Sequence, residues 1–381
     1  MESRPEQRKS SRRREFLKKG LGGGAAAGMV ALGLTKQTRA DGDDLYGKRP
    51  FCPPANWKEW ARKNFKGVEN ETMPSFNPDF TRLSERAIRH DVRMAVRHGF
   101  NSTLCAAESG LSFREARRLT AVAAHEGMGK IHVGSSVVFD SFDQCFAMVS
   151  HAKIVGCTHV LLGYPPSFNP KSVTEIHDIT SQLCKTADIG IVLYPKFDFM
   201  NVNPLDVVDA LDDIADIPNV IGAKIFDGPF LDQCFRRFGD RLLLSSPNPF
   251  TIIKNAGEYR QQWIGAGPYE VFQSPNRPYF VTMMNSILQG NFGKASGIFE
   301  MLQPVMESFM SRHGVAAMLG TYNWPEHKYY QFLSGANGGY TRQPVMKISK
   351  ETMDTIKKDY LSIGIEPIGP DDHFYLGRVN S

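Results

Sequence analysis

The stretch VIGAKI at residues 220–225 is an apolar run interrupted by one lysine, Lys224, and it decides the fold. A similar run, IVLY at residues 191–194, precedes it, and further runs recur along the chain at spacings of roughly 20–32 residues. Apolar runs separated by helix-length segments are typical of β-strand plus helix units whose strands form a buried parallel sheet. The pattern therefore places Lys224 in a buried strand.

Eight strands are expected from these runs. The first lies near residues 67–74, and the others cover residues 102–106, 131–134, 159–163, 191–194, 220–225, 242–245 and 263–266. Eight such units in about 200 residues fit a closed (β/α)8 TIM barrel, an α/β fold. An open doubly wound sheet is the alternative, but the sequence has no early G-x-G-x-x-G turn.

Helix signals fill the segments between the runs and continue beyond them. Residues 112–115 and 172–175 both have the S-x-x-E pattern of a capping box. We predict that residues 66–290 form the barrel and that residues 291–381 add a C-terminal helical region, with helices at residues 298–312 and 349–363.

The first 40 residues predict an export signal. Residues 1–40 carry a net charge of +7 and the remainder of the chain −2, so the basic excess does not indicate a nucleic-acid surface. Residues 12–18 (RRREFLK) resemble a twin-arginine signal, and residues 38–40 (TRA) offer a cleavage site. The apolar stretch between them, residues 20–34, is too short for a stable membrane anchor. A basic, disordered N-terminus is the alternative.

An exported protein would be periplasmic or secreted, and a twin-arginine signal is typical of chains that fold before export. We expect residues 41–65 to be an irregular N-terminal extension of the mature chain. Folding before export removes the need for disulfides, so we expect most of the six cysteines to be buried as small apolar residues. They are Cys52, Cys105, Cys145, Cys157, Cys184 and Cys234. Their spacing matches no zinc site, and no metal site is predicted.

Lys224 is the strongest candidate for chemistry. Burial disfavours the charged form of a lysine, and a neutral amine can attack a carbonyl to form a Schiff base. Tyr194 ends the neighbouring strand, where its phenol could relay protons to the carbinolamine. The alternatives are a lysine that extends to solvent or pairs with Asp227, and a tyrosine that only packs at the rim.

These two strands carry a family resemblance. IVLY at residues 191–194, followed by IPNVIGAK at residues 217–224, resembles the dihydrodipicolinate synthase / N-acetylneuraminate lyase family over about residues 67–363. Members of that family are class I aldolases on a (β/α)8 barrel. The resemblance implies that Lys224 is the Schiff-base lysine, that Tyr194 is the proton relay and that the protein is a homodimer or homotetramer.

The chain departs from the family pattern at the carboxylate-binding positions. Two threonines of the family correspond to Cys105 and Ala106, a tyrosine of the family falls at Ser167, and an arginine falls at Phe199, with Lys196 nearby as a substitute cation. These departures argue against lysine-precursor synthesis. Five phenylalanines after the fourth to sixth strands favour an aromatic or apolar substrate, or else pack the barrel against its helices. They are Phe168, Phe197, Phe199, Phe226 and Phe230.

The sequence thus predicts a Schiff-base lyase or aldolase, cleaving carbon–carbon or carbon–oxygen bonds in a small carbonyl compound such as a 2-oxo acid or an aromatic aldol. No cofactor is expected, because the lysine itself supplies the electron sink. The predicted substrate-binding residues are Cys105, Ala106, Glu108, Ser109, Ser167, Lys196, Phe199, Gly265 and Gly267. The alternatives are an exported barrel that binds a carbonyl ligand without turnover, and a metal-dependent hydrolase. Neither a nucleic acid nor a membrane is expected as a partner.

Overall fold

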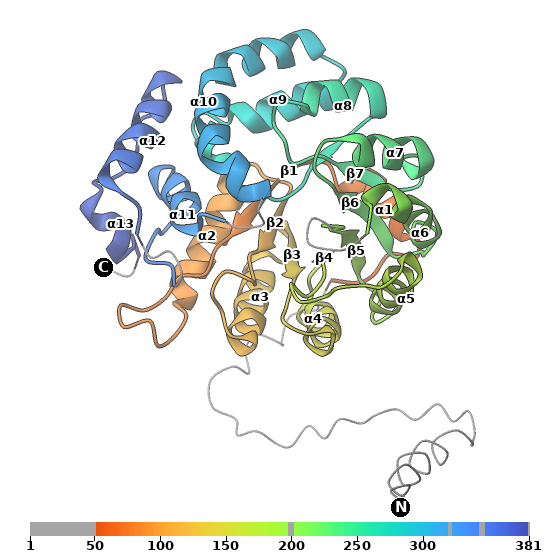
Figure 1. The fold of residues 1–381 in the computed structure, drawn as a ribbon. Coiled ribbons are helices and arrows are strands. Elements are labelled where there is room, and N and C mark those ends of the chain that lie inside the picture. Colours follow the sequence, from red (N-terminus) through yellow and green to blue (C-terminus); the bar gives the residue numbers. More distant parts are fainter. Residues whose placement is uncertain (1–50, 197–201, 319–321, 343–346, 380–381) are drawn as a thin grey trace, which may run out of the picture. The chain divides into compact units, whose positions relative to one another are not determined.

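The computed structural model describes residues 51–196, 202–318, 322–342 and 347–379. Within these residues, eight parallel strands form a ring surrounded by helices (Figure 1). The strands are β1 (Gly67–Thr72), β2 (Ser102–Cys105), β3 (His132–Val137), β4 (His159–Leu162), β5 (Gly190–Leu193), β6 (Val220–Lys224), β7 (Leu243–Ser245) and β8 (Trp263–Ile264). Every predicted strand is present, and the predicted (β/α)8 barrel is confirmed.

The helices alternate with the strands and then continue beyond the barrel. Those of the barrel region are α1 (Trp57–Asn64), α2 (Glu85–Arg97), α3 (Phe113–Gly127), α4 (Phe142–Val155), α5 (Val173–Cys184), α6 (Val208–Ile214), α7 (Pro229–Phe238), α8 (Ile252–Tyr259) and α9 (Tyr279–Leu288), with 3-10 turns at Pro204–Val207 and Tyr269–Phe272. Ser112 and Ser172 cap α3 and α5 by accepting hydrogen bonds from the N–H groups of Glu115 and Glu175. The predicted capping box is complete at α3, whereas at α5 the Glu175 side chain accepts from the N–H of Lys171 instead.

The sheet runs in the order β7-β6-β5-β4-β3-β2-β1-β8, and side chains join its two ends. The Oγ of Ser245 in β7 accepts a hydrogen bond of 2.9 Å from the N–H of Gly265. The side-chain amide of Gln261 donates to the carbonyls of Ser246 and Trp263, at 3.1 and 3.0 Å. Polar side chains therefore take the place of a β-ladder where β7 meets β8.

An irregularity between β5 and β6 determines which way Lys224 points. Ile191 pairs with Val220, but the next residue, Val192, pairs with Gly222, so β6 has one extra residue. Ile191 and Val220 pack in the layer between sheet and helices, whereas Val192 faces the barrel interior. Because the bulge shifts the alternation by one residue, Gly222 and Lys224 face the interior instead of the helices.

Helix α1 closes the N-terminal end of the barrel. Trp57, Ala61 and Phe65 are buried in one cluster with interior residues of the strands, among them Leu104 and Ile221. We expected residues 41–65 to be irregular, which was wrong for residues 57–64, although residues 51–56 form neither helix nor strand. The helix forms because Asn56 caps it and because Trp57 and Ala61, one turn apart, share a buried face.

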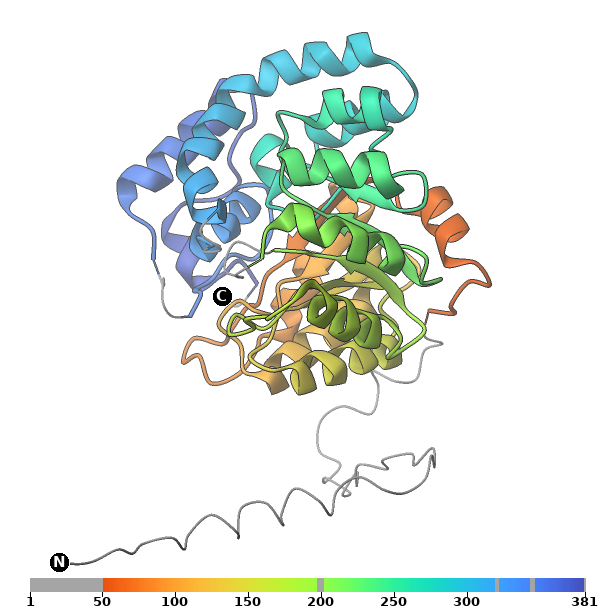
Figure 2. The ribbon, with the colours of Figure 1, turned by 45° about the vertical axis from the view of Figure 1, so that its right-hand side comes forward.

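Four further helices pack together beside the barrel (Figure 2). They are α10 (Phe292–Met318), α11 (Trp324–Leu333), α12 (Lys350–Ser362) and α13 (Asp372–Leu376). The predicted helices at residues 298–312 and 349–363 correspond to α10 and α12, whereas α11 was not predicted. Residues 44–381 form one compact unit that includes both the barrel and these helices.

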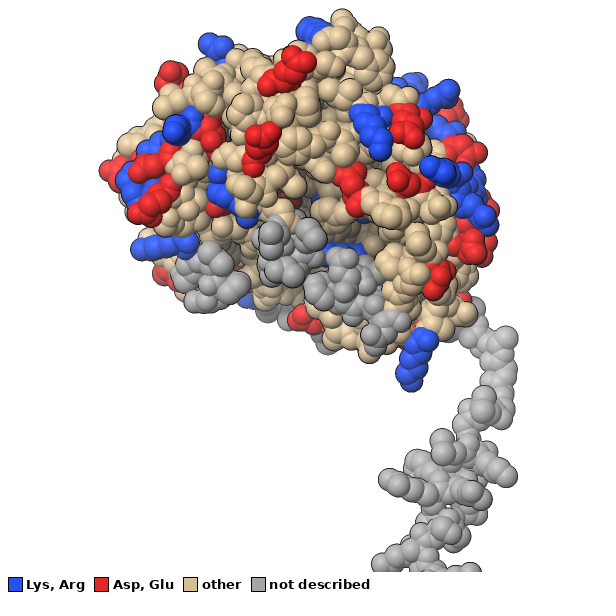
Figure 3. Space-filling view, turned by 45° about the horizontal axis from the view of Figure 1, so that its top comes forward, with Lys and Arg blue, Asp and Glu red and all other residues tan. Residues whose placement is uncertain are grey.

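The predicted signal at residues 1–40 lies outside the described residues. Among the described residues, no helix combines the length and the apolar character needed to cross a membrane. The face seen in Figure 3 carries acidic and basic side chains interspersed among uncharged ones, with a hollow near its centre.

Candidate active site

Strand β1, with the sequence GVENET, carries two glutamates into the barrel interior. Glu69 and Glu71 are buried and alternate with Val68, which packs in the outer layer. One carboxylate oxygen of Glu69 lies 2.7 Å from Nε2 of His159, and the other accepts a hydrogen bond of 3.1 Å from the N–H of Ala266. His159 is therefore a buried core histidine with a polar partner.

Lys224 lies at the C-terminal end of β6 with 7% of its surface exposed. Its Nζ donates a hydrogen bond of 2.7 Å to the carbonyl of Ala266. Burial lowers the pKa of Lys224, while the negative charges of Glu71, Glu69 and Glu108 act in the opposite direction, and burial prevails. At a given pH, a larger fraction of Lys224 than of a surface lysine is therefore in the neutral, nucleophilic form.

Tyr194 lies directly beside this amine. The Nζ of Lys224 is 5.5 Å from the centroid of the Tyr194 ring, and the Tyr194 hydroxyl is 2.8 Å from the hydroxyl of Tyr322. Burial raises the pKa of Tyr322 well above its ordinary value, so that phenol is protonated at neutral pH. Lys196 adds a second cation 5.9 Å from the ring centroids of Tyr322 and Phe226.

A cavity of about 280 Å³ opens in front of Lys224. Polar residues of its lining include Glu71, His313, Tyr322 and His327. Much of the rest is apolar and includes Phe226, Pro247, Pro268, Phe309 and Met310. The cavity lies at the C-terminal ends of the strands, where (β/α)8 barrels hold their reactive groups.

Sequence reasoning missed a chain of polar groups on one side of this cavity. Nδ1 of His327 is 2.9 Å from a carboxylate oxygen of Glu71, and Nε2 of His313 is 2.7 Å from Glu326. Burial on its own raises the pKa of Glu71, but the charge and hydrogen bond of His327, together with Lys224 and His313, leave that pKa below its ordinary value. These two histidines, which come from α10 and the unpredicted α11, were not among the predicted site residues.

Two of the predicted site residues are glycines that leave room for the lysine and the cavity. A Cβ atom on Gly265 would lie 3.0 Å from the Trp263 ring and 3.2 Å from Cδ of Lys224. Gly267 lines the cavity, and a Cβ there would lie 3.0 Å from the ring of Tyr269. A larger residue at either position would therefore require its neighbours to shift.

The predicted residues after β2 form a tight turn. The side chain of Cys105 packs in the layer between sheet and helices, and the Oγ of Ser109 donates to the carbonyl of Ala106 at 2.6 Å. Glu108 accepts a hydrogen bond from the hydroxyl of Ser136, and burial raises the pKa of Glu108. Of this group, Glu108 is close enough to Lys224 to influence its charge.

The remaining predicted residues are more dispersed. Ser167 is exposed in the turn after β4, and Phe199 lies outside the described residues, as does Phe197. Phe168 and Phe230 pack against the core between barrel and helices, whereas Phe226 lines the cavity. A substrate-binding role for these positions stays a prediction.

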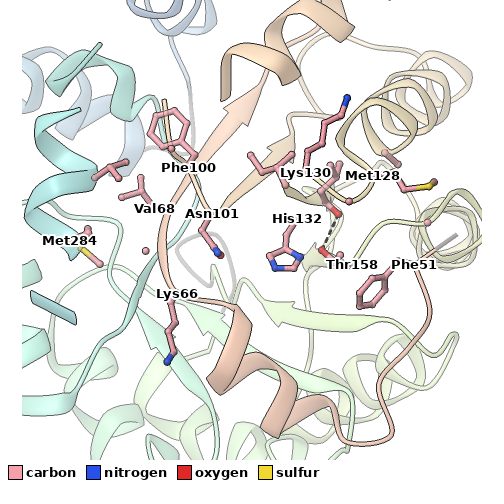
Figure 4. A pocket seen from close by; sticks show the side chains of 18 of the residues that line it. Phe51, Lys66, Val68, Phe100, Asn101, Met128, Lys130, His132, Thr158 and Met284 are labelled. Atoms are coloured by element: carbon pink, nitrogen blue, oxygen red, sulfur yellow. Dashed lines mark hydrogen bonds between the residues drawn. The ribbon is translucent and has the colours of Figure 1, made fainter. Parts of the chain in front are cut away.

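A second cavity, of about 640 Å³, lies at the opposite end of the strands (Figure 4). Asn101, His132 and Thr158, at or next to the beginnings of β2, β3 and β4, line it together with Lys66 and Lys130. Both lysines are exposed, and burial lowers the pKa of His132 to about 4. In the described residues no group of three or more His, Cys, Asp and Glu side chains could hold a metal ion.

Solved structures of known proteins share this fold. Dihydrodipicolinate synthase from Thermotoga maritima superimposes with a TM-score of 0.65 at 19% identity, covering 79% of this chain and 99% of that one. The synthase from Aquifex aeolicus gives 0.65 at 16% identity over 80% and 100% of the two chains. N-acetylneuraminate lyase from Fusobacterium nucleatum, in complex with pyruvate, gives 0.65 at 16% identity over 78% and 97%. The chain has the fold of these proteins.

The likeness covers nearly the whole length of each of these proteins and leaves about a fifth of this chain outside it. No family model and no curated protein matches the sequence. The predicted resemblance to dihydrodipicolinate synthase and N-acetylneuraminate lyase is therefore confirmed at the level of the fold.

Proposed function

We propose that this protein is a class I lyase or aldolase that forms a Schiff base with a small carbonyl substrate through Lys224. The observation that carries the proposal is the position of this amine, buried at the C-terminal end of β6 and facing a cavity beside Tyr194. The fold shared with a lyase that was crystallised with pyruvate supports the same kind of reaction.

The reaction would begin with attack by the neutral amine of Lys224 on the carbonyl carbon. The new C–N bond forms as the π electrons of the C=O bond move to oxygen, and loss of that oxygen as water leaves an iminium ion. The oxygen needs two protons to leave as water: Tyr194 would relay to it the one that the amine loses and would donate the other, which Tyr322 could replace along their 2.8 Å hydrogen bond. The iminium then accepts the electron pair of the bond that breaks.

The cavity favours a small substrate with an apolar portion. Aromatic and apolar side chains form much of its wall, and about 280 Å³ is a modest volume for a ligand site. Cys105 and Ala106 offer no hydroxyl to a 2-oxo acid carboxylate, and we assign that task to Lys196, whose ammonium lies 5.9 Å from the centroid of the Tyr322 ring. We therefore propose a carbonyl compound, either a 2-oxo acid held by Lys196 or an aromatic aldol-type substrate.

Borohydride trapping tests the proposal directly. The folded protein is incubated with pyruvate, acetone or benzaldehyde, reduced with borohydride and analysed by intact mass and peptide mapping. We expect a covalent adduct on Lys224 that Lys224→Met abolishes and Tyr194→Phe slows by about 100-fold or more. Lys254→Met, which removes a lysine from α8, is the matched control and keeps the adduct.

The absence of an adduct with every carbonyl would contradict the proposal and favour a barrel that binds its ligand without turnover. An adduct at another lysine would also contradict it, because the cavity in front of Lys224 would then not be the reactive site.

We also propose that the protein is exported and that it assembles as a homodimer or homotetramer. Export is supported by RRREFLK at residues 12–18, and oligomerisation by the family that the sequence resembles. Fractionation of cells expressing the full chain, compared with a variant carrying Arg13→Lys and Arg14→Lys, tests the first. Sedimentation of the purified protein tests the second.

A further inference from the structure

We propose that Glu71 and His327 form an acid–base dyad in the Lys224 cavity, in which His327 removes the proton from the substrate carbon next to the iminium and Glu71 orients the imidazole. The inference rests on the proposed function and assigns it a base that the sequence did not indicate. The dyad joins Glu71, at the end of β1, to His327 of α11, a helix outside the barrel.

The two side chains meet at the cavity wall. His327 is 4% exposed and Glu71 is 8% exposed, both line the cavity, and Nδ1 of His327 is 2.9 Å from Oε2 of Glu71. The rings of Trp324 and His313 cross the His327 ring at 79° and 67°, with centroids 5.5 and 5.0 Å away. Neighbours on two sides therefore fix the plane of the imidazole.

Helix α11 is anchored so that His327 reaches this position. Gln331, one turn after His327 on the same helix face, donates a hydrogen bond of 2.6 Å to the backbone carbonyl of Glu71. Lys328 donates a hydrogen bond of 2.7 Å to the carbonyl of Pro74, just beyond β1. These contacts hold α11 at the end of β1, so the distance between imidazole and carboxylate does not depend on a loose loop.

The pairing determines which ring nitrogen can act as a base. Glu71 has a pKa below its ordinary value, so it is a carboxylate at neutral pH and accepts a hydrogen bond from Nδ1–H. The neutral imidazole then carries its free electron pair on Nε2, the nitrogen turned away from Glu71. A carboxylate in this place also stabilises the imidazolium that forms when Nε2 takes a proton.

The step balances without any further reactant. Nε2 takes H⁺ from the carbon next to the iminium, and the electron pair of that C–H bond forms the C=C bond of an enamine. The π electrons of the iminium move to the nitrogen of Lys224, which becomes neutral. In the reverse direction, imidazolium returns the proton to carbon. Tyr194 and Tyr322 would remain available for the oxygen that leaves as water.

Hydrogen–deuterium exchange separates this step from Schiff-base formation. The folded protein is placed in D2O with pyruvate or acetone, whichever it traps, and loss of the methyl signal is followed by proton NMR. Borohydride trapping is measured on the same samples. We expect His327→Asn and Glu71→Gln to slow exchange by about 100-fold or more while both still form the reduced adduct on Lys224. Glu71→Gln would act by giving the imidazole the wrong tautomer.

His151→Asn is the control, because it removes another buried histidine, one whose Nε2 bonds to the carbonyl of Arg117 outside the barrel interior. It should exchange and trap like the wild type. Exchange at the wild-type rate in His327→Asn would overturn the dyad while leaving the proposed function intact, above all if Tyr194→Phe abolished exchange. Failure of the wild type to trap any of the three carbonyls on Lys224 would overturn the proposed function and, with it, the dyad, whereas trapping of benzaldehyde alone would overturn the dyad only.

Discussion

Lys224 is subject to two opposing influences, and their balance sets its reactivity. Removal from water favours the neutral amine, whereas three glutamates nearby favour the ammonium. The net effect is a pKa below the ordinary 10.5. A lysine poised in this way keeps a larger neutral fraction at physiological pH than a surface lysine, and the reaction needs that fraction.

The rate of adduct formation should therefore depend on pH in a defined direction. As the pH rises, the amine loses its proton, and we expect the rate to increase and then level off at a pH below 10.5. The measurement is the initial rate of borohydride-trapped adduct between pH 6 and pH 11 at saturating ketone. A rate that kept rising through 10.5 would mean that Lys224 behaves as a solvated amine.

The same shift should appear in stability. Because the folded pKa lies below that of the unfolded chain, the unfolded state holds more protons between the two values, and stability rises with pH in that window. Burying Lys224 thus costs stability below its folded pKa, and the cost disappears above 10.5. Relative to Lys224→Met, the wild type should gain stability from pH 7 towards pH 10 in urea denaturation.

Gly265 offers a test of how closely the lysine stem is packed. The methyl group of Gly265→Ala would lie 3.0 Å from the Trp263 ring and 3.2 Å from Cδ of Lys224. We expect a loss of about 1–3 kcal/mol in the free energy of unfolding, typical of overpacking, and slower adduct formation as the amine is displaced. Urea denaturation and borohydride trapping measure the two effects.

Gly297→Ala is the matched control. Gly297 lies inside α10, and a Cβ there would meet no atom within 4 Å. The same substitution should therefore stabilise the protein by about 0.5–1 kcal/mol and leave trapping unchanged. If the two variants behaved alike, the close contact at Gly265 would have no consequence for the site.

Helices and strands whose buried residues are apolar could be predicted from the sequence, whereas a buried helix that contains charged residues could not. The runs VIGAKI and IVLY marked β6 and β5 because strands covered on both faces are continuously apolar. Helix α11 was missed because residues 325–333 are buried all round although they include Glu326, His327 and Lys328. Charged residues in such a segment give no apolar stripe, and the sequence therefore resembles a loop.

The same reasoning explains which part of the site was found. Lys224 and Tyr194 were predicted from strand ends, yet the interior position of Lys224 depends on an extra residue in β6 that no local pattern indicates. Glu69 and Glu71 alternate in GVENET, and this spacing puts both on one face of a strand. Two glutamates on the inner face of a barrel strand were the available signal for the carboxylates of the site.

Helix α1 is an element whose contribution can be measured apart from the chemistry. Trp57 fills the N-terminal end of the barrel, where its Nε1 donates a hydrogen bond of 2.6 Å to Asp188. We expect Trp57→Ala to cost about 3–5 kcal/mol in urea denaturation, because it leaves a large cavity. Adduct formation at Lys224 in the folded protein should be unchanged, since the two sites lie at opposite ends of the strands.

Lys63→Ala, an exposed change on the same helix, should alter stability by less than about 0.5 kcal/mol. Loss of trapping in folded Trp57→Ala would show that the two ends of the barrel are coupled.

At the scale of the whole molecule, residues of both the barrel and the C-terminal helices line the cavity in front of Lys224. The barrel supplies Lys224 and Glu71 to its lining, while the C-terminal region supplies Tyr322 and His327. Tyr194 of the barrel contacts the Tyr322 hydroxyl. Neither set alone encloses the cavity. The chemistry that we propose therefore requires the complete folding of residues 44–381 as one compact unit.

If the protein folds before export, most of its thiols should be buried and reduced when it leaves the cytoplasm. The reactivity of the cysteines tests this expectation. Cys52 is exposed, whereas the other five are buried and free. Burial raises the pKa of Cys145 to about 11 and those of Cys105, Cys184 and Cys234 to about 12, so few thiolates form at neutral pH.

We expect iodoacetamide at pH 8 to add one group to the native protein, at Cys52, and six groups to the protein unfolded in urea without a reductant. Intact mass of material collected from the exported fraction gives both numbers. Fewer than six additions after unfolding would mean that disulfides form, contrary to the structure. More than one addition to the native protein would mean that the core opens at pH 8, and a buried, uncharged Lys224 would then lose its physical basis.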